Sequence, residues 1–181
     1  MYSIGCFLVW LLLVVLLCIL AALGMALGLS YPNPIRQRTV HQPAAILYLE
    51  LGRGHQKVIP EVFADTIAWY IPPRAAKAVW VLMVHGRSGN KEENVPLAGR
   101  LVAEGFGVYL FDMPGCGQNS FGRMAAAQAG VELVRAAVIR VQRKMCKGDK
   151  LVVYGHSLGG VLALQLQETA PDLAGIISDS A

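Results

Sequence analysis

Five short apolar runs constrain the fold of this 181-residue chain more than any other feature of its sequence. They are rich in branched and aromatic side chains, and turn-forming or charged residues bound them, which is typical of β-strands. Between several of them lie longer stretches with apolar residues at helical spacing, including 94–105 and 124–145. Strands that alternate with helices predict a parallel sheet with helices on both faces. The predicted strands are 66–72, 78–86, 107–112, 150–155 and 174–179, with a further candidate strand at 45–50.

The segment LVVYGHSLGG joins a predicted strand to a predicted helix and places Ser157 between Gly155 and Gly159. This is the G-x-S-x-G pattern of a nucleophile elbow. In such an elbow the serine occupies a strained turn, and its hydroxyl is held out at the carboxyl edge of the sheet. The structural alternative is a serine that caps the following helix, because serine is favoured at helix N-caps. We predict that Ser157 is a nucleophile and that both glycines make room for the turn.

A second motif, Val84-His85-Gly86-Arg87, ends the predicted strand at 78–86. In folds with a nucleophile elbow, this turn offers a backbone N–H to an oxyanion. The backbone N–H groups of Arg87 and Leu158 are the predicted pair of donors, and Gly86 is the predicted loop glycine. His85 would then support the loop. The alternative is a plain turn at the end of a strand.

These pieces resemble the α/β-hydrolase superfamily, specifically its esterase, lipase and serine-aminopeptidase-like branch. The resemblance covers about residues 46–181 and rests on TIAWYIPP, VLMVHGRSGN, DMPGCGQNS, VVYGHSLGG and GIISDSA, in the order of the family. It implies a doubly wound, mostly parallel sheet, with Ser157 as nucleophile and the N–H groups of Arg87 and Leu158 as oxyanion donors. The implied substrate is a carboxylic ester, such as a lipid or another acyl ester.

The sequence departs from the family after its predicted sixth strand. The triad of the family runs Ser, then Asp or Glu, then His, with the acid after the seventh strand and the histidine after the eighth. We therefore expect residues 45–181 to be an incomplete α/β-hydrolase domain, and we predict no base among His41, His55, His85 and His156. Asp179 ends the last predicted strand, where some relatives place the acid, but capping of a turn is its expected role.

Two functional hypotheses follow from these features. The first is a membrane-anchored serine hydrolase acting on a carboxylic ester. Without a base the hydroxyl of Ser157 is almost wholly protonated, so the chain alone should be close to inactive. The second is a catalytically inactive, truncated membrane protein or interaction module of the same fold, which exposes the edge of its last strand to a partner.

The N-terminal segment from Ile4 to Leu29 is apolar and carries no charge. Crossing a bilayer takes about 20 apolar residues, so residues 1–29 are a predicted single-pass anchor and residues 30–44 a juxtamembrane linker. Arg36 and Arg38 follow the segment, and the positive-inside rule then favours a cytoplasmic globular part. The alternative is a cleaved signal peptide, which would give a secreted or periplasmic protein.

The remaining features predict surfaces more than sites. Lys91, Glu92 and Glu93 should form a solvated start to a helix, and five basic residues should lie on the outer face of helix 124–145 or contact membrane phosphates: Arg135, Arg140, Arg143, Lys144 and Lys147. The net charge of +4 fits an ordinary solvated surface. No nucleotide-binding loop or metal-ligand spacing is present. We therefore expect no cofactor, no metal and no nucleic-acid partner, and protein partners stay open.

Overall fold

The computed structural model describes residues 4–30, 57–64, 66–75, 77–87, 89–119, 127–167, 170 and 172–181. The candidate strand at 45–50, the predicted linker beyond Ser30, and both His41 and His55 lie outside these ranges. The chain divides into two compact units, Met1–Tyr31 and Pro32–Ala181.

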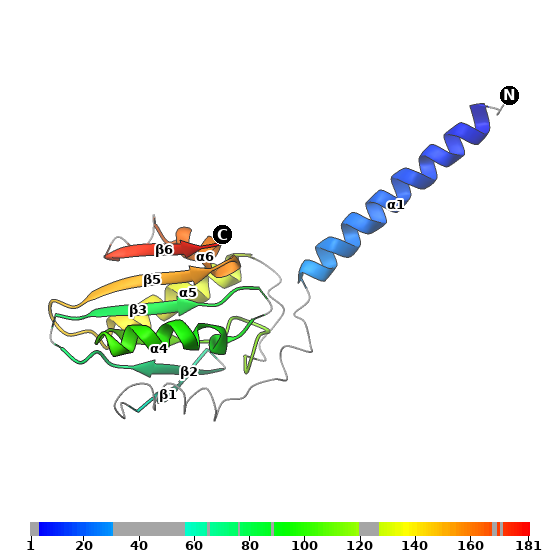
Figure 1. The fold of residues 1–181 in the computed structure, drawn as a ribbon. Helices are drawn as coiled ribbons and strands as arrows, with labels where there is room; N and C mark the ends of the chain where they lie inside the picture. The colour runs from blue at the N-terminus through cyan, green and yellow to red at the C-terminus, as the bar shows by residue number, and fades with distance from the viewer. Residues whose placement is uncertain are drawn as a thin grey trace. The chain divides into compact units, whose positions relative to one another are not determined.

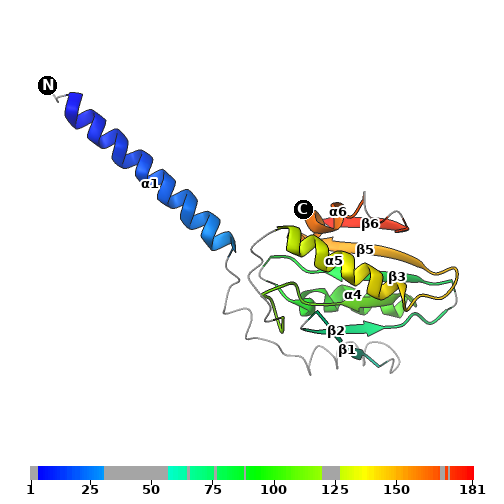
Figure 2. The same cartoon turned by 180° about the vertical axis from the view of Figure 1, so that it is seen from behind.

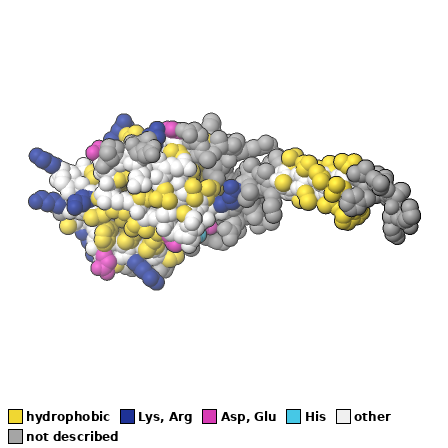
Figure 3. Space-filling model, turned by 90° about the horizontal axis from the view of Figure 1, so that it is seen from above, with side chains coloured by type: hydrophobic (Ala, Val, Ile, Leu, Met, Phe, Trp, Pro, Cys, Tyr) yellow, Lys and Arg dark blue, Asp and Glu magenta, His cyan; other side chains and the backbone are white. Residues whose placement is uncertain are grey.

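The first unit is helix α1 (Ile4–Ser30). Its side chains are described over residues 10–23, where they are almost all hydrophobic and exposed, Trp10 by 64% and Leu12 by 68% (Figure 3). Across the parts of the chain that the structure describes, no helix has the length and apolarity needed to cross a membrane. The predicted anchor over residues 1–29 is therefore not supported, although residues 4–29 are helical as expected.

The second unit is built on a six-stranded sheet (Figure 1). The order across the sheet is β1-β2-β4-β3-β5-β6. Strands β4, β3, β5 and β6 are mutually parallel, whereas β1 and β2 form an antiparallel hairpin and β2 pairs antiparallel to β4. The predicted α/β architecture with a mostly parallel sheet is confirmed. The strands are β1 (Ile59–Phe63), β2 (Thr66–Ile71), β3 (Val79–Val84), β4 (Gly107–Leu110), β5 (Lys150–His156) and β6 (Gly175–Asp179).

Helices cover both faces of the sheet. On one face lies α4 (Val95–Ala103), which follows the short 3-10 helix η1 (Lys91–Asn94), and on the other lie α5 (Ala127–Gln142) and α6 (Leu158–Leu164) (Figures 1 and 2). Successive side chains of β3 alternate between the two cores. Val81 and Met83 pack on the α4 side, whereas Trp80 and Leu82 pack on the α5 and α6 side. A strand buried on both faces needs a continuous apolar sequence, and this explains VWVLMV.

Strand β1 is an element that the sequence analysis missed. Its sequence IPEVF holds Pro60, which cannot donate to a ladder and is confined to edge strands, and β1 is indeed an edge strand. Glu61 of β1 accepts hydrogen bonds from the Tyr109 hydroxyl at 2.7 Å, Arg140 Nε at 3.1 Å and Lys144 Nζ at 2.5 Å. Arg140 and Lys144 are two of the five basic residues predicted to lie on the outer face of helix 124–145. They instead contact the sheet through Glu61.

Lys91 is not solvated, so that prediction was wrong. Its side chain is 1% exposed, and Nζ lies 2.6 Å from Oδ2 of Asp112, which is 0% exposed. The Asp112 carboxylate also accepts the backbone N–H groups of Lys91 at 2.8 Å and Gln118 at 2.9 Å. A buried charge needs such a partner, and the aspartate that provides it lies 21 residues further along the chain. Glu93 is exposed, as expected.

Candidate active site at the end of strand β5

Ser157 lies in the turn between β5 and α6 with φ 50° and ψ −119°. A non-glycine residue with positive φ is uncommon, and such a conformation costs about 1–3 kcal/mol. The Ser157 N–H donates to the carbonyl of Asp179 at 2.7 Å, and its own carbonyl accepts from Gly160 N at 2.8 Å. A capping serine would have an extended backbone and would accept a backbone N–H. Ser157 makes no such side-chain bond, so the capping alternative does not fit.

The two flanking glycines are sterically required. A Cβ atom on Gly155 would overlap the carbonyl of Gly159 and the nitrogen of Gly160. A Cβ atom on Gly159 would lie 2.5 Å from the carbonyl oxygen of Val84 and 2.7 Å from that of His85. The close approach therefore joins the Ser157 turn to the end of β3, and only glycine permits it.

The loop after β3 also meets the Ser157 turn. A Cβ atom placed on Gly86 would lie 3.5 Å from Cβ of Ser157 and 3.0 Å from Nδ1 of His156. The structure thus brings together Gly86 and Ser157, although 71 residues separate them in the chain. Arg87 and Leu158, the predicted oxyanion donors, are the next residues after these two. Arg87 is exposed, and Leu158 begins α6.

His85 is a buried structural residue of this loop. Its Nε2 accepts the backbone N–H of Met113 at 2.9 Å, and its Nδ1 lies 2.7 Å from the carbonyl oxygen of Gly86. These partners assign the proton to Nδ1. Burial lowers the pKa of His85 and favours the neutral ring. Because both ring nitrogens are occupied, His85 is not placed to take a proton from Ser157, which agrees with its predicted supporting role.

Asp179 carries the carboxylate next to the turn. It pairs in register with His156 across β5 and β6. Its Oδ2 accepts the Tyr154 hydroxyl at 2.7 Å, and its Oδ1 accepts the Ser180 hydroxyl at 3.0 Å. The bond from Tyr154 is the main cause that holds the pKa of Asp179 below its ordinary value. Burial, and then the bond to Asp179, raise the pKa of Tyr154 to about 12.

Tyr154 is a residue that the sequence analysis missed. It lies in the apolar strand β5, three positions before Ser157. Its sequence context therefore indicates only a core residue. The signal that was available is the alignment of two parallel strand ends, because β5 and β6 both finish at the carboxyl edge of the sheet. Polar groups at that edge lie close together whatever their separation in the sequence.

The described part of the chain offers no base for Ser157. It contains two histidines, His85 and His156. His85 is occupied as above, and His156 immediately precedes Ser157 as the last residue of β5. No hydrogen bond joins either ring to the Ser157 hydroxyl among the described residues. Within the same ranges, no three His, Cys, Asp or Glu side chains form a group that could hold a metal ion.

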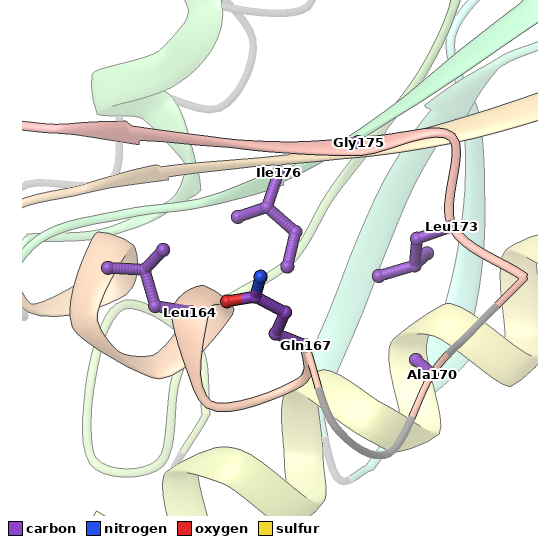
Figure 4. A pocket seen from close by; sticks show the side chains of 6 residues that line it. All are labelled: Leu164, Gln167, Ala170, Leu173, Gly175 and Ile176. Atoms are coloured by element: carbon purple, nitrogen blue, oxygen red, sulfur yellow. The ribbon is translucent and has the colours of Figure 1, made fainter.

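A cavity of about 270 Å³ lies away from this site, between the end of α6 and the start of β6 (Figure 4). Ser157 is at the opposite ends of these two elements, because α6 starts beside it and β6 finishes beside it. The cavity is therefore not the space in front of Ser157. It is lined by Leu164, Gln167, Ala170, Leu173, Gly175 and Ile176.

A mostly parallel sheet with helices on both faces and a strained serine turn at its carboxyl edge are the features of an α/β-hydrolase domain. The family model described as the alpha/beta hydrolase fold matches residues 79–181, and the chain belongs to this family. A curated relative is 2,6-dihydropseudooxynicotine hydrolase of Paenarthrobacter nicotinovorans, 28% identical over 146 residues. The match covers 79% of this chain and 39% of that hydrolase. The chain therefore spans about two fifths of the length of that relative.

Solved structures share the fold at low sequence identity. An esterase of Pyrococcus furiosus is 19% identical, with a TM-score of 0.58 over 68% of this chain and 49% of that protein. A soluble variant of monoglyceride lipase from Saccharomyces cerevisiae is 22% identical, with a TM-score of 0.50 over 68% and 43%. A Thermus thermophilus protein, TT1662, is 24% identical, with a TM-score of 0.55 over 67% and 56%.

Proposed function

We propose that this chain carries the nucleophile of a serine hydrolase that acts on carboxylic esters. The observation that carries the proposal is the backbone of Ser157, with φ 50° and ψ −119° and with close-packed glycines on both sides. Backbone strain persists only where the surrounding structure enforces it, and it clusters at functional sites. Ser157 also lies outside the carboxyl ends of parallel strands, where open α/β sheets bind their ligands.

The proposed reaction is acyl transfer through the hydroxyl of Ser157. Oγ attacks the ester carbonyl carbon while a base takes the hydroxyl proton, and the carbonyl oxygen becomes an oxyanion. We assign its stabilisation to the backbone N–H groups of Arg87 and Leu158. The intermediate then expels the alcohol, which takes the proton back, and leaves an acyl group on Ser157. Water attacks this acyl-enzyme by the same steps and releases the carboxylic acid.

Ester substrates are favoured over other acyl compounds by the relatives. The solved structures that share the fold include an esterase and a monoglyceride lipase. The curated relative is also a hydrolase, although its name indicates a different substrate. The proposal therefore names a carboxylic ester and leaves its acyl and alcohol parts open. Membrane attachment through the α1 segment stays a prediction from the sequence.

The proposal requires a base from outside the described residues. Loss of a triad member lowers rates by orders of magnitude and leaves only the contribution of the oxyanion donors and of binding. His41 and His55 lie outside the described residues, and the sequence predicts neither as the base, so we propose that the 181-residue chain alone reacts slowly. The competing function is an inactive module of the same fold, and the lack of a placed histidine among the described residues is the observation in its favour.

Fluorophosphonate labelling with peptide mapping tests the proposal. The protein isolated from its own source should acquire one adduct on Ser157, and the Ser157→Ala variant and urea-unfolded protein should acquire none. The recombinant 181-residue chain should react on the order of 1,000-fold more slowly. An unlabelled Ser157 in the native protein would favour the inactive module. Rapid labelling of the recombinant chain would contradict the proposal that its 181 residues hold no base for Ser157.

A further inference from the structure

Strand β6 holds the Ser157 turn directly. The N–H of Ser157 donates to the carbonyl of Asp179 at 2.7 Å, which continues the β5–β6 pairing one residue beyond its last register pair, His156 and Asp179. The strained residue is thereby tied to a single backbone carbonyl. The position of that carbonyl depends on where the end of β6 lies.

The end of β6 is itself held by the side chain of Asp179. Its carboxylate accepts the hydroxyl of Tyr154 at 2.7 Å and that of Ser180 at 3.0 Å. A hydrogen bond to an ionised carboxylate is roughly twice as strong as one between neutral groups. Tyr154 belongs to β5, so this bond ties Asp179 to β5, whereas the Ser157–Asp179 bond ties the same residue to the turn after β5.

This edge is solvent-exposed from Ser178 to Ala181, but it approaches the first turn of α6 closely at one point. A Cβ atom on Gly160, in the first turn of α6, would lie 2.5 Å from the hydroxyl of Ser178 and 3.0 Å from Cβ of Ala181. Ser180 has a φ of 55° and is, like Ser157, a non-glycine residue in the left-handed region. Two strained residues at one edge imply that the contacts between β6 and the turn keep both in place.

We propose that the Tyr154–Asp179 hydrogen bond is a positioning device for Ser157. It keeps the carbonyl of Asp179 against the N–H of Ser157 and so holds the serine in the conformation that presents its hydroxyl. Tyr154 and Asp179 are positioning residues that need not touch the substrate. The inference rests on the proposed function, because it assumes that the hydroxyl of Ser157 reacts.

Two measurements on the full chain test this inference. The first is amide hydrogen exchange at Ser157, divided by exchange at Leu82 in the central strand β3. The second is the rate of Ser157 modification by a fluorophosphonate during a long incubation. The variants are Tyr154→Phe, Asp179→Ala and Asp179→Asn. The matched control is Tyr109→Phe, because Tyr109 donates to the carboxylate of Glu61 at the same 2.7 Å elsewhere in the sheet.

Tyr154→Phe and Asp179→Ala should each raise the exchange ratio about 5- to 10-fold and lower the labelling rate about 3- to 10-fold, the range expected for one net hydrogen bond. The Tyr154→Phe/Asp179→Ala double variant should change the exchange ratio and the labelling rate no more than Asp179→Ala does. Asp179→Asn should keep the exchange ratio and the labelling rate close to those of the unchanged chain, because the amide oxygen of asparagine can still accept the hydrogen bond from Tyr154. Tyr109→Phe should lower global stability without changing either property of Ser157.

Equal exchange ratios in Tyr154→Phe and Tyr109→Phe would overturn the inference. An increased exchange ratio with an unchanged labelling rate would also overturn it, because the bond would then be structural only. Failure of the native protein to label at Ser157 would instead contradict the proposed function. In that case the exchange comparison alone still decides whether Tyr154 and Asp179 hold the turn.

Discussion

Lys91→Met should destabilise the globular unit strongly, although Lys91 belongs to no proposed site. Methionine retains most of the apolar stem and removes the ammonium group that lies 2.6 Å from the Asp112 carboxylate. Both side chains are at most 1% exposed, so water cannot replace the lost partner. Asp112 retains the backbone donors of Lys91 and Gln118 but loses its charged partner. Breaking a buried pair from one side costs about 3–5 kcal/mol, and this is the expected loss in free energy of unfolding.

Urea unfolding followed by tryptophan fluorescence measures this loss. Arg135→Met is the matched control, because Arg135 pairs with Glu132 at 3.2 Å on the surface, where the two side chains are 35% and 51% exposed. Exposed pairs contribute about 0–1 kcal/mol. The reasoning is that the buried Asp112 carboxylate depends on Lys91 for its charged partner. It would be refuted if Lys91→Met lowered the free energy of unfolding no more than Arg135→Met does.

Three further predictions concern the turn, the β1 strand and the N-terminal helix. Gly159→Ala should lower the free energy of unfolding by about 1–3 kcal/mol or more, because its Cβ would lie 2.5 Å from the Val84 carbonyl oxygen. Gly175→Ala is the control and should be near neutral in the same urea assay, because open space surrounds its Cβ. Equal losses in the two variants would contradict the steric account. Burial raises the pKa of Glu61, but hydrogen bonds from Lys144, Tyr109 and Arg140 outweigh it and leave the pKa below its ordinary value of 4.5. The stabilising contribution of Glu61 should therefore be complete above about pH 4.5 and be lost as pH falls through the lower folded-state pKa. Glu61→Gln should flatten this dependence of the free energy of unfolding on pH. An unchanged dependence in urea titrations between about pH 3 and 6 would contradict this prediction. If residues 1–29 attach the protein to membranes, the full chain should float with liposomes and a 31–181 chain should not; equal flotation would contradict the sequence-based prediction.

The fold could be predicted because its central strands are buried on both faces. The run VWVLMV has no polar position, and such continuity distinguishes an inner parallel strand from a half-exposed one. Strand β1 escaped prediction for the opposite reason. It is an edge strand with Pro60 and Glu61 in its middle, and its stability comes from contacts with residues about 50 to 80 positions away, Tyr109, Arg140 and Lys144.

The turn around Ser157 was predicted because glycine spacing reports local steric demand. Gly155 and Gly159 are required by contacts within the turn and with the end of β3, so they leave a short-range signal. The roles of Lys91 and Tyr154 left none. Each depends on a carboxylate supplied by a distant segment, Asp112 or Asp179, and only the folded sheet brings those groups together.

Fluorophosphonate modification of the protein from its own source, followed by peptide mapping, tests the central claim most directly. A hydrolase that uses Ser157 should carry one probe per chain, located on the peptide that contains GHSLGG, and prior unfolding in urea should abolish the modification. An unmodified Ser157 in a sample where other serine hydrolases react would contradict that claim.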